Sequence, residues 1–201
     1  MKKVKHIKGN LLDFPPYCKN DPNSYTGINN IAHSCNTRNI MGGGIALQIK
    51  NRYPQAYEAD TEAFNQEYDK DGQYINWLGK YSKAEIKSKF LPNNKGRIYN
   101  LYTQASVGRD ERQVNYEVFW RALKRMQEDL LFIQHETGEP QVLGLPYGIS
   151  CGLAGGNWKI ILAIIEDIFE DSLIQTYIVE FEMIQNTILN KAEELGRLAN
   201  K

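Results

Sequence analysis

The sequence has no excess of charge of either sign, no cysteine framework and no long apolar run. Its 201 residues carry 24 basic and 24 acidic side chains, so no overall field draws the chain to nucleic acid or to an anionic membrane. No apolar stretch is long enough to span a bilayer, and the basic start at residues 1–6 lacks the apolar core of a signal peptide. We therefore expect a cytoplasmic domain with no membrane partner. No nucleic acid partner is indicated, and binding to a polyanion would need a local basic patch.

Cysteine and histidine are also scarce. The 3 cysteines are odd in number and widely spaced, which argues against disulfides and for a reducing compartment. The 3 histidines, His6, His33 and His135, are too far apart to show the spacing of metal ligands. We therefore expect no metal site and no cofactor.

Glycine, in contrast, is concentrated in two places. Residues 42–44 are all glycine, and they lie between a short apolar stretch and a helix-like segment at residues 45–49. A second cluster, at residues 148–156, also lies between an apolar run and a helix. Ordering glycine costs backbone entropy, so such runs are typical of places where backbone N–H groups must approach a ligand. At a helix N-terminus these groups bind anions, so two such loops predict a ligand with several phosphates, or with phosphates and ribose between them.

Apolar periodicity predicts alternating strands and helices, and hence an α/β sheet covered on both faces. We expect strands at residues 3–8, 28–34, 75–81, 97–103, 141–146 and 173–181, with residues 83–89 as a connector. We expect helices at residues 45–52, 56–68, 115–135 and 158–169, with Pro54 ending or kinking the first. A last amphipathic helix at residues 182–201 packs either on the domain or on a partner.

In open α/β sheets, ligands bind outside the carboxyl ends of the strands, where both glycine loops fall. Neither loop matches a nucleotide-binding signature. No lysine follows the glycines as in a P-loop, and the G-x-G-x-x-G dinucleotide pattern is missing.

Two side chains beside these loops can do chemistry. His33 precedes the first loop and is a candidate acid, base or hydrogen-bond donor, although a lone histidine is usually structural. Cys151, inside the second loop, suggests a thiol nucleophile. A cysteine-dependent phosphatase also needs an arginine a few residues on, and residues 152–157 contain none. A covalent cysteine mechanism is therefore disfavoured.

Several of these motifs, taken in order, resemble the macrodomain family. They are Gly9-Asn10-Leu11, Ile31-Ala32-His33-Ser34-Cys35-Asn36, Gly42-Gly43-Gly44-Ile45-Ala46 and Leu145-Pro146 through Trp158. The His-Ser-Cys-Asn block, five-residue spacer and Gly-Gly-Gly-Ile-Ala block are similar to those of small stand-alone macrodomains that remove phosphate from ADP-ribose 1″-phosphate. The resemblance covers residues 3–181, and only the last helix lies outside it.

The resemblance implies a three-layer α/β/α sandwich with a mixed sheet at residues 1–181, with the helix at 182–201 appended. The implied ligand is ADP-ribose or ADP-ribose 1″-phosphate. Its binding residues would be Gly9, Asn10, Leu11, Ser34, Gly42, Gly43, Gly44, Ile45, Ser150, Cys151, Gly152, Leu153, Ala154 and Gly155. Of these, Asn10 and Leu11 would cradle adenine, Gly42 to Gly44 would face the distal ribose, and Ser150 to Gly155 would wrap the diphosphate. Many relatives have an aspartate in place of Asn10, so adenine selectivity is expected to be looser here.

The resemblance also implies a reaction. The related terminal ADP-ribose protein glycohydrolase uses a lysine and an aspartate at positions where this chain has Gln104 and Ala154, which disfavours removal of ADP-ribose from protein carboxylates. Phosphomonoester hydrolysis remains, with His33 as the acid or water-orienting group and Asn36 placing the terminal phosphate. The alternatives are a non-catalytic module that binds ADP-ribose or a related nucleotide, and, more weakly, a docking protein that uses residues 182–201.

Overall fold

The computed structural model describes residues 3–13, 26–66, 76–87, 95–108 and 110–182. These residues form β1 (Val4–Gly9), β2 (Asn30–Asn36), α1 (Gly44–Arg52), α2 (Pro54–Asn65), β3 (Tyr81–Lys87), β4 (Lys95–Gln104), α3 (Tyr116–Thr137), β5 (Val142–Pro146), α4 (Trp158–Phe169) and β6 (Gln175–Phe181). None of the described helices is long and apolar enough to cross a membrane. The helix expected at residues 182–201 lies outside the described residues except for Glu182.

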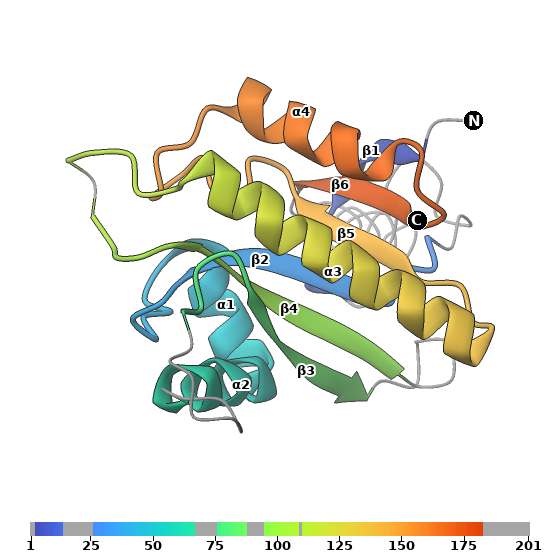
Figure 1. Cartoon of the computed structure of the whole chain (residues 1–201), viewed down its shortest axis with the longest axis horizontal. Helices are drawn as coiled ribbons and strands as arrows, with labels where there is room; N and C mark the ends of the chain where they lie inside the picture. The colour runs from blue at the N-terminus through green and yellow to red at the C-terminus, as the bar shows by residue number, and fades with distance from the viewer. Residues whose placement is uncertain (1–2, 14–25, 67–75, 88–94, 109, 183–201) are drawn as a thin grey trace, which may run out of the picture.

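The strands form one sheet in the order β1-β6-β5-β2-β4-β3. All neighbouring strands are parallel except β3, which runs antiparallel to β4, so the sheet is mixed. Helices α3 and α4 lie side by side over one face, whereas α1 and α2 lie on the other (Figure 1). The structure thus confirms the predicted three-layer α/β/α sandwich.

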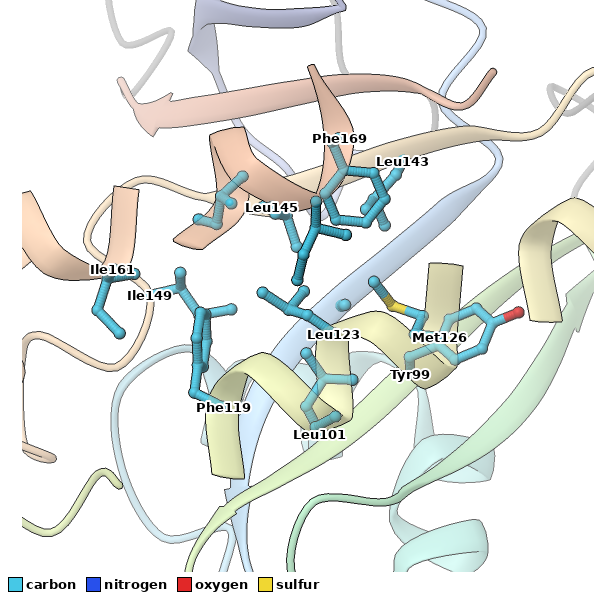
Figure 2. Packing of buried hydrophobic residues seen from close by; sticks show 14 of the residues in the cluster. Tyr99, Leu101, Phe119, Leu123, Met126, Leu143, Leu145, Ile149, Ile161 and Phe169 are labelled. Atoms are coloured by element: carbon cyan, nitrogen blue, oxygen red, sulfur yellow. The ribbon is translucent and has the colours of Figure 1, made fainter. Parts of the chain in front are cut away.

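Each face of the sheet has its own core. Figure 2 shows the larger one, in which α3 and α4 pack on the central strands through Tyr99, Leu101, Phe119, Leu123, Met126, Leu143, Leu145, Ile149, Ile161 and Phe169. The core on the other face includes Ile28, Ile31, Ile49, Ala56 and Ile98. Burying one side chain of this size contributes roughly 1.5–3 kcal/mol. Apolar burial in these two cores therefore explains why two helices pack on each face of the sheet.

Local signals set the helix ends. Asn115 caps α3, because its side chain accepts a hydrogen bond from the N–H of Val118, and Gly138 ends the helix with φ +68°. Pro54 is the first residue of α2, where its missing N–H costs nothing. It therefore separates α1 from α2, as the sequence predicted.

One predicted strand is misplaced. Residues 76–80 form a turn rather than part of a strand, and the strand itself is β3 (Tyr81–Lys87), which had been expected to be a connector. Trp77 gave the turn an apolar appearance, but its ring packs against Tyr102, with centroids 5.5 Å apart. In β3 only Ala84 and Ile86 are buried, and the charged residues that alternate with them, Lys83, Glu85 and Lys87, are exposed. The sequence of an edge strand with one solvent-exposed face thus resembles that of a polar connector.

The centre of the sheet determines where a ligand can enter. Strands β2 and β5 are neighbours, yet the chain leaves β2 toward α1 on one face and leaves β5 toward α4 on the other. Two loops that diverge from adjacent parallel strands leave a crevice between them at the carboxyl edge. Both glycine loops are these diverging loops.

Gly144 in β5 offers a test of how tightly this centre is packed. A Cβ at Gly144 would lie 2.6 Å from Leu11 Cδ1 and 3.1 Å from Ile28 Cγ2. Gly144→Ala should therefore lower the free energy of unfolding in urea by about 1–3 kcal/mol. Gly152→Ala is the control, since a Cβ there meets nothing within 4 Å, and it should change the value by no more than about 0.5 kcal/mol. Equal effects of the two variants would contradict this packing.

Candidate ligand-binding site

A cavity of about 690 Å³ opens at the carboxyl edge of the sheet, and both glycine loops line it. We call residues 37–43 the first glycine loop and residues 147–157 the second. The volume lies within the range of small-molecule sites, roughly 300–1,000 Å³. The predicted site residues that line it are Asn10, Leu11, Ser34, Asn36, Gly42, Gly43, Gly44, Ile45, Ser150, Gly152, Leu153 and Ala154. The structure therefore brings these residues, from both halves of the chain, together around one cavity.

The first glycine loop leads into an uncapped helix. Gly43 is the N-cap residue of α1, no side chain caps the first turn, and that turn contains no acidic residue. Gly44, Ile45 and Ala46, which form the turn, line the cavity. The N-terminus of α1 thus presents N–H groups and the positive end of the helix dipole to the cavity.

The second glycine loop also presents backbone donors. In the part of the chain that the structure describes, the N–H groups of Gly152, Leu153 and Ala154 donate to no acceptor, and all three residues line the cavity. Ser150 precedes them with φ +63°, a left-handed conformation that costs a non-glycine residue about 1–2 kcal/mol. Its hydroxyl is hydrogen-bonded to that of Ser34 from β2.

The two loops touch across the cavity. A Cβ built on Gly43 would lie 2.8 Å from Cδ1 of Leu153, so any side chain at position 43 would have to displace Leu153. Together with the Ser34–Ser150 hydrogen bond, this contact fixes the distance between the two sets of donors. Here glycine lets the two loops approach closely while Leu153 keeps its present position.

Four of the predicted site residues do not line the cavity: Gly9, His33, Cys151 and Gly155. Gly9 ends β1, and its carbonyl accepts a hydrogen bond from the N–H of Glu182. The Cys151 thiol donates to the carbonyl of Ile149, and burial raises its pKa, which is the opposite of an activated thiolate. Gly155, with φ +67°, turns the chain back toward α4.

His33 lies in the interior. Its side chain is 0% exposed, and Nε2 lies 2.8 Å from Oδ1 of Asn100. Nδ2 of Asn100 donates to the carbonyl of Ala56 and to the hydroxyl of Ser82, so Oδ1 faces the histidine and Nε2 carries the proton. Burial lowers the pKa of His33 to about 4, so the ring is neutral. Contrary to the expectation, this geometry assigns His33 to the interior rather than to the cavity's chemistry.

Asn36 lines the cavity, but its side chain is already engaged. Oδ1 accepts from the N–H groups of Arg38 and Ile40, and Nδ2 donates to the carbonyl of Ile40. The amide therefore shapes the first glycine loop. A phosphate placed by Asn36 would have to use the remaining hydrogen of Nδ2.

The cavity is lined by uncharged groups. None of the described Asp, Glu, Lys, Arg or His residues lines it, so its anion-binding capacity lies in backbone N–H groups and in neutral side-chain donors such as the Ser34 and Ser150 hydroxyls. Nor does any group of three His, Cys, Asp or Glu residues in the described ranges have the arrangement of a metal site. Sequence reasoning missed the lining residues Leu12, Gln48, Val107, Gly108 and Phe181. Val107 and Gly108 follow β4, whose loop carries no glycine cluster to draw notice.

The buried state of His33 predicts a pH dependence of stability. The pKa of His33 is about 4 in the folded chain, against an ordinary value of 6.5. Between these pH values the unfolded chain binds more protons than the folded chain, so the free energy of unfolding falls as the pH is lowered. His33→Gln keeps a donor for Asn100 and removes this titration. Between pH 7 and 4, wild type should lose on the order of 3 kcal/mol more unfolding free energy than the variant, measured by urea denaturation. Parallel pH profiles would show that the ring is accessible to solvent.

Comparisons with known proteins agree with this geometry. No family model matches the chain. The chain is 27% identical over 195 residues to the ADP-ribose 1″-phosphate phosphatase of Saccharomyces cerevisiae, a match that covers 88% of this chain and 99% of that one.

Solved structures are similar as well. A macrodomain protein from Streptomyces coelicolor matches with a TM-score of 0.58 and 22% identity over 90% of this chain and 99% of that one. Thermosipho africanus DarTG, solved in complex with ADP-ribose, matches with a TM-score of 0.55 and 16% identity over 78% of this chain and 39% of that one. This chain therefore has the macrodomain fold, as its motifs predicted, and is similar in sequence to an ADP-ribose 1″-phosphate phosphatase.

Proposed function

We propose that the cavity binds ADP-ribose 1″-phosphate and that the chain releases its terminal phosphate as inorganic phosphate. The observation that carries this proposal is that two sets of free backbone N–H groups face one neutral cavity from opposite sides. Such a cavity suits a diphosphate, because its amides stabilise the anion without a competing carboxylate. Sequence similarity to the yeast phosphatase supports the choice of substrate.

The adenine end would lie against Asn10 and Leu11. Oδ1 of Asn10 already accepts from the N–H of Leu12, which fixes the amide in a tight turn and leaves one lone pair for an adenine amino group. Val179 and Phe181, at the end of β6, line the same cavity and supply an apolar surface for the ring. The diphosphate would then meet residues 152–154, and the distal ribose would meet residues 42–44.

The proposed reaction is a hydrolysis. A water oxygen attacks phosphorus, the bond from phosphorus to the ribose 1″ oxygen breaks, and that oxygen takes up a proton to give ADP-ribose. One water proton passes by way of a phosphoryl oxygen to the leaving 1″ oxygen and the other stays on the released phosphate, because no described Asp, Glu, Lys, Arg or His residue lines the cavity to relay a proton. The chain contributes position and N–H groups that stabilise the phosphoryl oxygens.

A second candidate is a binding module without turnover. The lining favours it, because general acid–base catalysis requires a titratable group of suitable pKa within reach of the reacting atoms. The titratable groups in the described lining are the Tyr147 phenol and the Cys35 thiol, and burial raises the pKa of that thiol. Both candidates predict the same bound nucleotide. They differ only in what happens to the terminal phosphate.

Two measurements on the full chain separate these candidates. Calorimetric titration with ADP-ribose should show binding to one site, and a phosphate-release assay should show turnover of ADP-ribose 1″-phosphate. Binding without release would favour the module and overturn the hydrolase. No binding of either nucleotide would overturn both.

Ser150 allows strain and function to be measured separately. Ser150→Ala and Ser150→Gly both remove the hydroxyl, but only the alanine variant keeps a side chain at φ +63°. The glycine variant should therefore be more stable than the alanine variant by about 1 kcal/mol in urea. Because Ser150 and its hydrogen-bond partner Ser34 both line the cavity, phosphate release should fall in both variants by about tenfold or more. Full activity of both variants would show that the hydroxyl serves only to join Ser150 to Ser34.

A further inference from the structure

A second cavity, of about 520 Å³, lies on the other side of the first glycine loop. It is enclosed by that loop, the C-terminal end of α2 and the turn before β3, and it shares no lining residue with the first cavity. Its volume would hold many waters, at roughly 30 Å³ each, and therefore also a small organic molecule. The proposed hydrolysis makes no use of it.

A buried carboxylate lines this cavity. Asp60 of α2 is 1% exposed, and its Oδ1 accepts a hydrogen bond of 2.9 Å from the hydroxyl of Tyr102. Its Oδ2 is also buried, but it has no hydrogen-bond partner. An unpartnered carboxylate oxygen in the interior is costly, so a group that donates to Oδ2 would gain more than it would at the surface.

A second Tyr–Asp pair in the same protein indicates what kind of group would donate to Oδ2 of Asp60. Tyr99, also on β4 but facing the other side of the sheet, donates to Asp129 at 2.7 Å. There the ammonium of Lys83 completes the arrangement, at 2.8 Å from Oδ1 and 2.7 Å from Oδ2. Among the described residues, the Asp60 pair differs in having no cation within ion-pair distance, and the Lys50 ammonium acts on it only from farther away.

No described side chain supplies this cation. The ion pairs among the described residues do not include Asp60. The nearby ammonium of Lys50 lies instead over the ring of Tyr57, 3.6 Å from its centroid. Aromatic rings also line the cavity, among them Trp77, whose π face already attracts the ammonium of Lys80 at 5.9 Å.

We propose that the second cavity binds an organic cation whose ammonium or guanidinium N–H groups donate to Oδ2 of Asp60 and whose carbon atoms pack against Trp77. Two kinds of ligand have this chemistry. One is a free small-molecule amine or guanidine, and the other is a lysine or arginine side chain of another protein. This site is independent of the proposed phosphatase activity, so it can fail or succeed on its own.

The three tryptophans provide reporters for the test. Trp77 lines the second cavity, whereas Trp120 bonds to Asp167 and Trp158 packs on Tyr147. The full chain is labelled with fluorotryptophan, and Trp77→Phe assigns its ¹⁹F resonance. Titration with ethylguanidinium should shift the resonance of Trp77 and leave the other two in place. Ethylurea, a neutral molecule of nearly the same shape, should bind far more weakly.

Two matched variants test the carboxylate itself. Asp60→Asn should weaken ethylguanidinium binding by about tenfold or more, because a charge-assisted hydrogen bond is lost. Asp129→Asn removes the carboxylate of the other Tyr–Asp pair and should leave binding unchanged. Three outcomes would overturn the proposal. They are that Asp60→Asn binds ethylguanidinium as tightly as wild type does, that wild type binds ethylurea as tightly as ethylguanidinium, or that the ¹⁹F resonances of all three tryptophans shift equally. The last two outcomes are read on wild type, so they hold even if Asp60→Asn fails to fold.

The pH dependence distinguishes a cation from a neutral ligand. Burial raises the pKa of Asp60 to about 6, against the opposing effects of Tyr102 and the Lys50 ammonium. The groups that interact with it are Lys50 on α1, Tyr102 on β4 and Cys35 on β2, and burial raises the pKa of both Tyr102 and Cys35. Ethylguanidinium binding should therefore weaken as the pH falls below about 6, since the carboxyl becomes neutral. Affinity independent of pH would contradict the role of Asp60.

A last comparison identifies the source of the cation. A capped tripeptide with one central arginine is titrated beside ethylguanidinium under the same conditions. Tighter binding of the peptide would support the proposal with a protein side chain as the ligand. Tighter binding of ethylguanidinium would support it with a free small molecule. Failure of both to bind would overturn it.

Discussion

The ligand site depends on backbone N–H groups that the fold leaves without acceptors. Most buried or half-buried amides pair within helices and strands, so free donors must be created by geometry. Here they arise because β2 and β5 are neighbours whose chains leave to opposite faces. Each loop must turn sharply within a few residues, and each then enters a helix. The adjacency of two parallel strands therefore determines both the crevice and its chemistry.

Free N–H groups bind a ligand well only when the loop that carries them is fixed in position. In each glycine loop, a buried apolar side chain fixes the backbone. Ile149 in the second glycine loop belongs to the large core beneath α3 and α4 (Figure 2). Met41 in the first glycine loop is buried in a small cluster with Cys35, Ala63 and Tyr102. Each glycine-rich segment is thus attached to the interior at a neighbouring residue. This attachment offsets the entropy that glycine would otherwise contribute to the unbound loop.

Beneath the sheet's carboxyl edge, polar groups form a chain with one direction. Nε2 of His33 donates to Asn100, Asn100 donates to Ser82, the Ser82 hydroxyl donates to Tyr102, and Tyr102 donates to Asp60. Each hydrogen points toward the carboxylate, which explains why a neutral histidine and a buried aspartate coexist in one interior. Of this network, the sequence revealed only His33, because its other members are spread over α2, β3 and β4.

The features that stood out in the sequence were those that depend on backbone groups, above all the two glycine loops. The two glycine clusters that stood out in the sequence, between strand-like and helix-like segments, both line the cavity. Two sequence predictions, one for a side chain and one for a strand, disagreed with the structure for identifiable reasons. His33 lies on β2, where successive side chains point to opposite faces, and the sequence does not reveal which face holds the ligand. Strand β3 was overlooked because only Ala84 and Ile86 mark its buried side.

The wall between the two cavities is short and well supported. Residues Asn36 and Ile40 line the first cavity, and Thr37 and Asn39 line the second. Asn36 bonds to both the N–H and the carbonyl of Ile40, and Asn39, with φ +54°, donates to the hydroxyl of Thr61 on α2. A ligand in one cavity can change affinity in the other only if it alters this wall, because coupling requires a structural difference that both sites sense. A segment held from both sides resists such a change, so the two sites should bind their ligands independently.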